Sequence, residues 1–207
     1  MPIVKDFDLN FNSRVIIWEI TELETQLISM LKLSKKENTL FNSIKLVSKR
    51  KEFLVIRLIL NFLNIKINNL IYNSLGKPVL KLNKFISISH SLNILVLAVS
   101  KNEIGVDIEK ERKKISLVKQ KFLSRFENNF LTKTNEDKML TRIWTSKEAI
   151  YKIINMPGIS FKKNITIKPF KLNDSSGIAI VKTDNFNLNF KLKFITFREY
   201  YLTLAYK

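Results

Sequence analysis

The amino-acid sequence predicts an α+β fold: a pseudo-dimer of two similar lobes, each a small antiparallel sheet packed against a long helix. Each half of the 207-residue chain contains one long amphipathic helical stretch. Each half also contains short β-rich stretches, and several of these are separated by linkers of hairpin length. The repeated order of elements predicts an N-terminal lobe over residues 1–102 and a C-terminal lobe over residues 103–207.

The first lobe is predicted to begin with a strand and to continue with helices. Residues 14–20 (RVIIWEI) form an apolar run typical of a strand, and residues 22–42 are polar and helix-prone. A long helix is expected next, because apolar residues recur at helical spacing in SKRKEFLVIRLILNFLN. Arg50 and Arg57 lie one heptad apart on this helix and therefore share a face.

The remaining strands of the first lobe follow a turn at residues 75–78 (LGKP), where Gly and Pro interrupt regular structure. Apolar stretches come next, and the short linkers between them favour hairpins. We therefore expect an antiparallel meander over residues 85–89, 94–100 and 104–109.

The second lobe is predicted to repeat this plan from strand 104–109 onward. Helical sequence is expected over residues 116–131, followed by a long helix from the predicted N-cap Asn135 to Ile154. Four β-rich stretches then follow, over residues 164–170, 177–182, 186–197 and 201–206.

The composition is that of a folded globular protein, with 45% hydrophobic residues and only 4 Gly and 4 Pro. The absence of Cys excludes a disulfide scaffold, a thiol nucleophile and thiolate-bound zinc. The net charge of +18 favours an acidic partner: nucleic acid, an anionic membrane, a phosphorylated ligand or an acidic protein. No signal-like segment and no apolar run near the ~18 residues of a membrane span is present, so we expect a cytoplasmic protein.

Asp107 and Glu109 are two residues apart in a predicted strand, so their carboxylates project from the same face. The segment is otherwise apolar, and two like charges are costly there. A hard cation such as Mg2+, bound through oxygen ligands, would resolve this conflict. A strand end whose acids face water is the alternative.

The segment WTSKEAIYK places Trp144, Glu148 and Lys152 on one helix face. A carboxylate beside a lysine suits phosphoryl chemistry, which needs a metal ligand or base and a cation for the charge on a leaving phosphate. Two structural explanations stay open: a surface ion pair between Glu148 and Lys152, or a capping box formed by Thr145 and Glu148.

His90 is the only histidine, and it lies between Ser89 and Ser91 at the end of a predicted strand. An imidazole and a hydroxyl at this place can hydrogen-bond a phosphate or assist proton transfer. A structural histidine with satisfied hydrogen bonds is the commoner case. The glycine-rich motifs G-x-x-x-x-G-K-[ST] and G-x-G-x-x-G and the zinc motif H-E-x-x-H are absent.

Six short segments follow one another along the chain: residues 76–78 (GKP), 86–91 (ISISHS), 105–109 (GVDIE), 126–127 (FE), 144–149 (WTSKEA) and Lys152. Taken in this order, they resemble the signature of the 4'-phosphopantetheinyl transferases of the surfactin-synthetase-activating type. Upstream of them, the residues RKEFL and Arg57 resemble the basic helix of that family with lower specificity.

The resemblance implies two α+β lobes with the active site in the cleft between them. It implies a holo-[acyl-carrier-protein] synthase activity, in which the phosphopantetheine arm of coenzyme A passes to a serine hydroxyl of an apo acyl or peptidyl carrier protein. Adenosine 3',5'-bisphosphate is released. With coenzyme A and the carrier as partners, we expect a monomer that binds neither nucleic acid nor a membrane.

Carried over residue by residue, the resemblance implies that Asp107, Glu109 and Glu148 hold Mg2+ on the pyrophosphate. Glu148 would also be the base, directly or through a metal-bound water, and Lys152 would steady the charge on the pyrophosphate. The residues expected to grip the nucleotide are Arg50, Arg57, Lys77, Ser89 and His90.

The chain departs from the family pattern after the catalytic helix, where it has Asn155 and many relatives have glycine. Asn also adopts the left-handed conformation that ends a helix. Two other functions stay open: a non-catalytic, basic nucleic-acid-binding relative, and an enzyme of the same fold that uses another pyrophosphate donor. Clustered carboxylates argue against the first, because a phosphate-backbone binder gains nothing from them.

Overall fold

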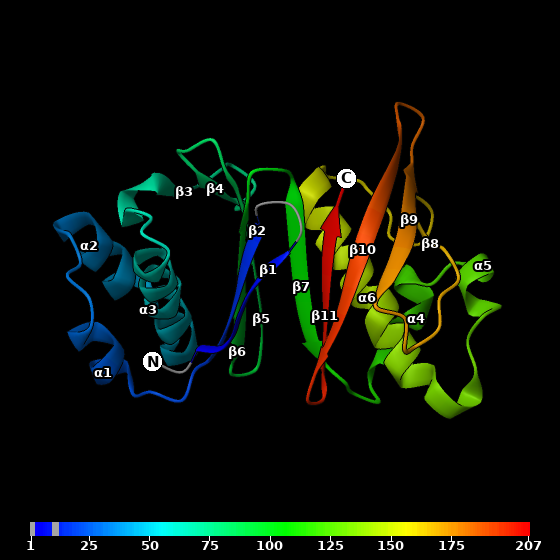
Figure 1. Cartoon of the computed structure of the whole chain (residues 1–207), viewed down its shortest axis with the longest axis horizontal. Coiled ribbons are helices and arrows are strands. Elements are labelled where there is room, and N and C mark those ends of the chain that lie inside the picture. Colours follow the sequence, from blue (N-terminus) through cyan, green and yellow to red (C-terminus); the bar gives the residue numbers. More distant parts are fainter. Residues whose placement is uncertain (1–2, 10–12) are drawn as a thin grey trace.

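The computed structural model describes residues 3–9 and 13–207 and confirms a mixed fold of antiparallel sheets and helices. Two sheets lie next to each other in the middle of the molecule, with helices on their outer sides (Figure 1). Within the described residues, no helix combines the length and the apolar composition that a membrane span requires.

The first half of the chain forms a four-stranded sheet in the order β1-β2-β6-β5, and its neighbouring strands are antiparallel. The long helix α3 packs its apolar face on this sheet, where Leu54, Ile59 and Leu60 are fully buried. Strands β3 and β4 form a separate hairpin. The elements are β1 (Ile3–Leu9), β2 (Ser13–Glu19), α1 (Glu24–Ser29), α2 (Lys35–Ser43), α3 (Val47–Phe62), η1 (Ile67–Asn69), β3 (Leu70–Tyr72), β4 (Pro78–Leu80), β5 (Phe85–Ser91) and β6 (Ile94–Ser100).

The second half forms a five-stranded sheet in the order β7-β11-β10-β9-β8. The long helix α6 packs on this sheet, and its buried residues include Leu140, Ile143 and Ile150. The elements are β7 (Ile104–Lys110), α4 (Ile115–Phe122), α5 (Arg125–Asn128), η2 (Lys133–Asn135), α6 (Glu136–Ile154), β8 (Ile165–Ile167), β9 (Ser176–Lys182), β10 (Asn187–Phe197) and β11 (Tyr200–Tyr206).

A third apolar core joins the two sheets. It is formed by buried side chains from β2, β6, β7 and β11, among them Val15, Val96, Val106 and Leu204. The four strands of this core are covered on their other face as well, so they form nearly continuous buried runs. This explains why Ile94–Ser100 is buried along its whole length.

The predicted meander is correct for its first two strands and wrong for the third. Strands β5 and β6 pair as antiparallel neighbours, but β7 pairs with β11 and belongs to the other sheet. The short linker after β6 therefore carries the chain from one sheet to the next. The capping prediction at Asn135 is correct for the position only, because its side chain makes no cap hydrogen bond to α6.

Candidate functional site

The candidate site lies where strand β7 crosses helix α6. Gly105 allows these two elements to touch, because a Cβ atom at this position would lie 1.9 Å from the backbone oxygen of Ala149. Only a residue without a side chain fits such a close backbone contact. Asp107 follows on β7, and Glu148 and Lys152 lie on α6 on either side of the crossing.

Asp107 is buried, with 5% of its surface exposed. Its Oδ1 accepts hydrogen bonds from Ser89 Oγ at 2.7 Å and from Lys152 Nζ at 2.8 Å. Its Oδ2 is also buried and has no hydrogen-bond partner among the described residues. A buried carboxylate oxygen without a partner is costly, so this atom marks a place for a donor or a cation from outside the chain.

Glu109 and Glu148 are held in environments that disfavour their charged forms. Burial raises the pKa of Glu109, against the lowering effect of the hydrogen bond that Ser91 donates at 2.9 Å. Burial also raises the pKa of Glu148 to about 7, with Asp107 and Glu109 adding to the rise and Lys152 opposing it. The three carboxylates therefore interact electrostatically, and their repulsion is only partly compensated by Lys152.

The donor set fits Mg2+ in its chemistry, because it consists of carboxylate oxygens and includes the partnerless Oδ2 of Asp107. In the arrangement that the described residues adopt, no three acidic or histidine side chains are grouped closely enough to hold a metal ion. The assignment of Asp107, Glu109 and Glu148 as magnesium ligands therefore stays a prediction.

The raised pKa of Glu148 predicts that the free energy of unfolding of the metal-free protein depends on pH. The folded state binds the proton of Glu148 more tightly than the unfolded state, so stability falls as the pH rises from 4.5 through about 7. Glu148→Gln removes this loss and should stabilise the protein by about 2 kcal/mol at pH 8, after allowance for screening by water. Urea unfolding of the wild type and the variant, with a chelator at pH 5 and pH 8, measures this gain in stability. An equal gain at both pH values would contradict the prediction.

Lys152 lies at the site, and neither of the two structural explanations of its segment is correct. Its Nζ donates to Asp107 Oδ1 at 2.8 Å and to the carbonyl oxygen of Val106 at 2.9 Å, so its ion-pair partner is Asp107 and not Glu148. The capping-box explanation is wrong, because Thr145 lies in the middle of α6 and its hydroxyl donates to the carbonyl of Arg142.

His90 lies at the edge of the site, where it meets the beginning of helix α3. Lys49 Nζ donates to His90 Nε2 at 2.7 Å, and Glu52 Oε1 lies 3.5 Å from the same nitrogen. Partial burial lowers the pKa of His90, an effect that Glu52 opposes and Lys49 reinforces. Sequence reasoning missed Lys49, although the basic start of this helix was the available signal, and it named Glu52 only as part of the segment RKEFL.

Arg50 and Arg57 are engaged in ion pairs with the outer helices. Arg50 Nε donates to Glu24 at 2.7 Å, and the buried Arg57 donates to Glu37 at 2.6 Å. Arg57 also stacks on Phe53, with 3.2 Å from its guanidinium carbon to the ring centre. The nucleotide-binding role of both arginines stays a prediction, and the structure already gives each of them a partner.

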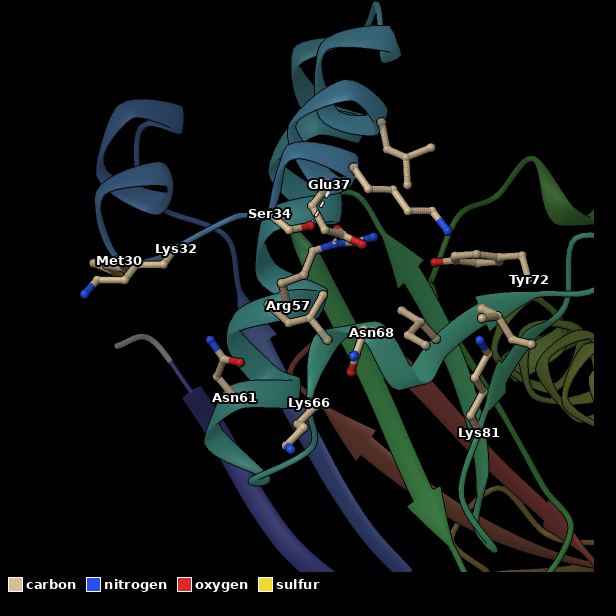
Figure 2. Close-up of a pocket in the computed structure, with 15 residues that line it drawn as sticks. Met30, Lys32, Ser34, Glu37, Arg57, Asn61, Lys66, Asn68, Tyr72 and Lys81 are labelled. Carbon is tan, nitrogen blue, oxygen red and sulfur yellow. Dashed lines mark hydrogen bonds and ion pairs between the residues drawn. The ribbon is translucent and has the colours of Figure 1, made fainter.

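Arg57 lines a cavity of about 970 Å3 among α2, α3, η1 and β3 (Figure 2). Lysines surround this cavity, namely Lys32, Lys36, Lys66 and Lys81. It shares no lining residue with the cavity beside Lys152 described next. Arg57 and Lys152 thus line different cavities.

Lys77 and Lys152 line one cavity of about 260 Å3, between the turn at residues 75–78 and the end of α6. Lys77 Nζ donates to the carbonyl oxygen of Ile153 at 2.8 Å, and burial lowers the pKa of this amine. Asn155, also at this cavity, has a φ of 48° and ends α6 in the left-handed conformation that the sequence suggested.

Lys147, in the same segment as Glu148, points away from the site into the core of the second lobe. Its Nζ bonds to Glu127 Oε2 at 2.7 Å and to the carbonyls of Phe122 and Phe161, each at 2.8 Å. Both members of the ion pair are fully buried. Glu127 also accepts from the backbone N–H groups of Ser124 and Ile167, so the pair ties α6 to two other segments.

Lys147→Met should therefore lower the free energy of unfolding by about 3–5 kcal/mol, because it leaves the Glu127 carboxylate buried without its cation. Urea unfolding measures the loss. Lys138→Met, on an exposed part of the same helix, is the matched control and should change stability by about 0.5 kcal/mol or less. A loss no larger than that of the control would show that the buried pair is dispensable.

Comparison with models of protein families gives a match over the second half of the chain. Residues 103–205 match the sequence model of the 4'-phosphopantetheinyl transferase superfamily. The matched segment contains Asp107, Glu109, Glu148 and Lys152, and it does not distinguish the surfactin-synthetase-activating type from other members. A search of curated proteins gives no match.

Proposed function

We propose that this chain, whose residues 103–205 match the 4'-phosphopantetheinyl transferase superfamily, transfers the phosphopantetheine arm of coenzyme A to a carrier protein. The acceptor is a serine hydroxyl of an apo acyl or peptidyl carrier protein. One observation carries the proposal for this chain: the partnerless Oδ2 of Asp107, which is buried in a carboxylate that pairs with Lys152 and interacts electrostatically with Glu109 and Glu148.

The reaction makes one bond and breaks one. The carrier serine Oγ attacks the phosphorus that bears the pantetheine arm, and the bond from this phosphorus to the bridging oxygen of the pyrophosphate breaks. Adenosine 3',5'-bisphosphate leaves. Glu148 accepts the proton of the serine hydroxyl.

The other residues position and neutralise the anionic donor. When bound, Mg2+ supplies charge neutralisation for the pyrophosphate, and Asp107, Glu109 and Glu148 would hold it. Lys152 adds a positive charge at the same place. Lys77 and His90, with its neighbour Lys49, provide hydrogen-bond donors for the nucleotide end.

The enzyme needs no nucleophile of its own, because the attacking serine belongs to the partner. This agrees with the absence of Cys and with a single histidine. The net charge of +18 also suits a polyanionic donor and an acidic protein acceptor.

Release of adenosine 3',5'-bisphosphate from coenzyme A tests the proposal. Chromatography of the reaction mixture should show this product only when the protein, Mg2+ and an apo carrier protein are all present. Equal release without a carrier would instead indicate hydrolysis of the pyrophosphate and would contradict a transferase.

A further inference from the structure

Strands β5 and β7 belong to different sheets, yet they run side by side and are joined through serine side chains. Every second residue at the end of β5 is a serine, and each hydroxyl accepts a hydrogen bond from a backbone N–H of β7. We call these residues the serine ladder. The bonds are Ser87 Oγ from Val106 at 2.9 Å, Ser89 Oγ from Ile108 at 3.3 Å and Ser91 Oγ from Lys110 at 3.2 Å.

Two members of the ladder also use their hydroxyl protons on the carboxylates of the candidate site. Ser89 Oγ donates to Asp107 Oδ1 at 2.7 Å, and Ser91 Oγ donates to Glu109 Oε2 at 2.9 Å. Both serines are buried, at 6% and 4% exposure, so water competes little for these bonds. Ser87 holds the backbone of β7 in the same way, but among the residues that the structure describes no hydrogen bond joins it to a carboxylate.

We propose that Ser91 is a positioning residue that orients the Glu109 carboxylate, as Ser89 does for Asp107. Each hydroxyl fixes one carboxylate oxygen and leaves the other oxygen for a ligand. The serines belong to the first sheet and the carboxylates to the second, so the contact between the sheets sets the orientation of both acids. This inference rests on the proposed function only in treating the two carboxylates as ligands of Mg2+.

The test compares Ser91→Ala with Ser87→Ala. Each variant loses one hydrogen bond to the backbone of β7, and Ser91→Ala also loses the bond to Glu109, so Ser91→Ala should lower Tm at least as much as Ser87→Ala. Ser91→Ala should in addition weaken Mg2+ binding about tenfold, measured by calorimetry with Mg2+ as the only added ligand, and should lower kcat for transfer by a similar factor. Ser87→Ala should change both values less than about twofold, and Ser91→Thr, which keeps the hydroxyl, should recover most of the loss.

A double-mutant cycle shows whether Ser91 acts through Glu109. In a Glu109→Gln background, Ser91→Ala should cause no further loss of Mg2+ affinity, whereas independent effects would multiply. Ser91→Cys, close to serine in size and a weaker donor, should give an intermediate loss and replaces Ser91→Ala if that variant folds poorly.

Two outcomes overturn the positioning role: equal Mg2+ affinities of the Ser91→Ala and Ser87→Ala variants, or a wild type that binds no Mg2+. Absence of transfer by the wild type refutes the proposed function alone. The comparison of Mg2+ affinities then still decides on Ser91, because it does not depend on turnover.

Discussion

Asp107→Asn should abolish carrier modification, with a loss of roughly a thousandfold in kcat/KM. Asp107 accepts bonds from Ser89 and Lys152 through one oxygen, and its other oxygen is buried without a partner. Asparagine keeps the shape of the side chain and removes the charge on which Lys152 and the predicted Mg2+ depend. Intact-protein mass spectrometry of the carrier measures the rate, and circular dichroism checks that the variant is folded.

Asp184→Asn, at an exposed position of the second lobe, is the matched control and should keep the wild-type rate. A folded Asp107→Asn variant that modifies the carrier within twofold of the wild type would remove Asp107 from the site.

Gly105→Ala should lower the free energy of unfolding by about 3 kcal/mol, which is large for the addition of one methyl group. The new Cβ would lie 1.9 Å from the backbone oxygen of Ala149, so the strand or the helix has to move. This movement separates Asp107 and Glu109 from Glu148 and should also reduce activity in the molecules that stay folded. Chemical denaturation and a transfer assay below the unfolding transition measure the two effects.

Gly177→Ala is a suitable control in the same sheet. Its Cβ would meet the tip of the Phe194 ring at 2.7 Å, and a side chain yields more readily than a backbone carbonyl. The control should therefore lose less stability than Gly105→Ala and keep its activity. Equal stability of Gly105→Ala and the wild type would show that β7 and α6 can separate without cost.

Local periodicity predicts most of the secondary structure of this chain. Apolar residues at helical spacing indicate α3 and α6, and the expected strand 14–20 corresponds to β2 (Ser13–Glu19). Strand β1 was not predicted, because IVKDFDL mixes charged and apolar residues and its sheet pairing comes from β2. Tertiary pairing decides such short strands more than propensity does.

Local sequence signals also do not predict which strand pairs with β7. A three-residue linker is typical of a hairpin, yet β7 crosses to the second sheet and pairs with β11, near the C-terminal end of the chain. Its contact with β5 runs through serine side chains, and no pattern of apolar residues reports such a contact. The alternation of serines in ISISHS was visible in the sequence, but its partners were not.

Of the predicted site residues, the structure brings together those that follow Gly105 on β7 and those on α6. The spacing of Arg50 and Arg57 indicates a shared helix face but not what this face meets. In the folded chain it meets Glu24 and Glu37, and Lys49 is the residue that reaches His90. Long polar side chains are thus placed by neighbours from distant elements, which a single sequence does not disclose.

The central claim is most directly tested by the intact mass of an apo acyl carrier protein after incubation with this protein, coenzyme A and Mg2+. We predict that the carrier gains the mass of one phosphopantetheine arm, and that a chelator or a change of the acceptor serine to alanine prevents the gain. An unchanged mass for acyl and peptidyl carriers alike, with a protein shown to be folded, would contradict the proposed transfer.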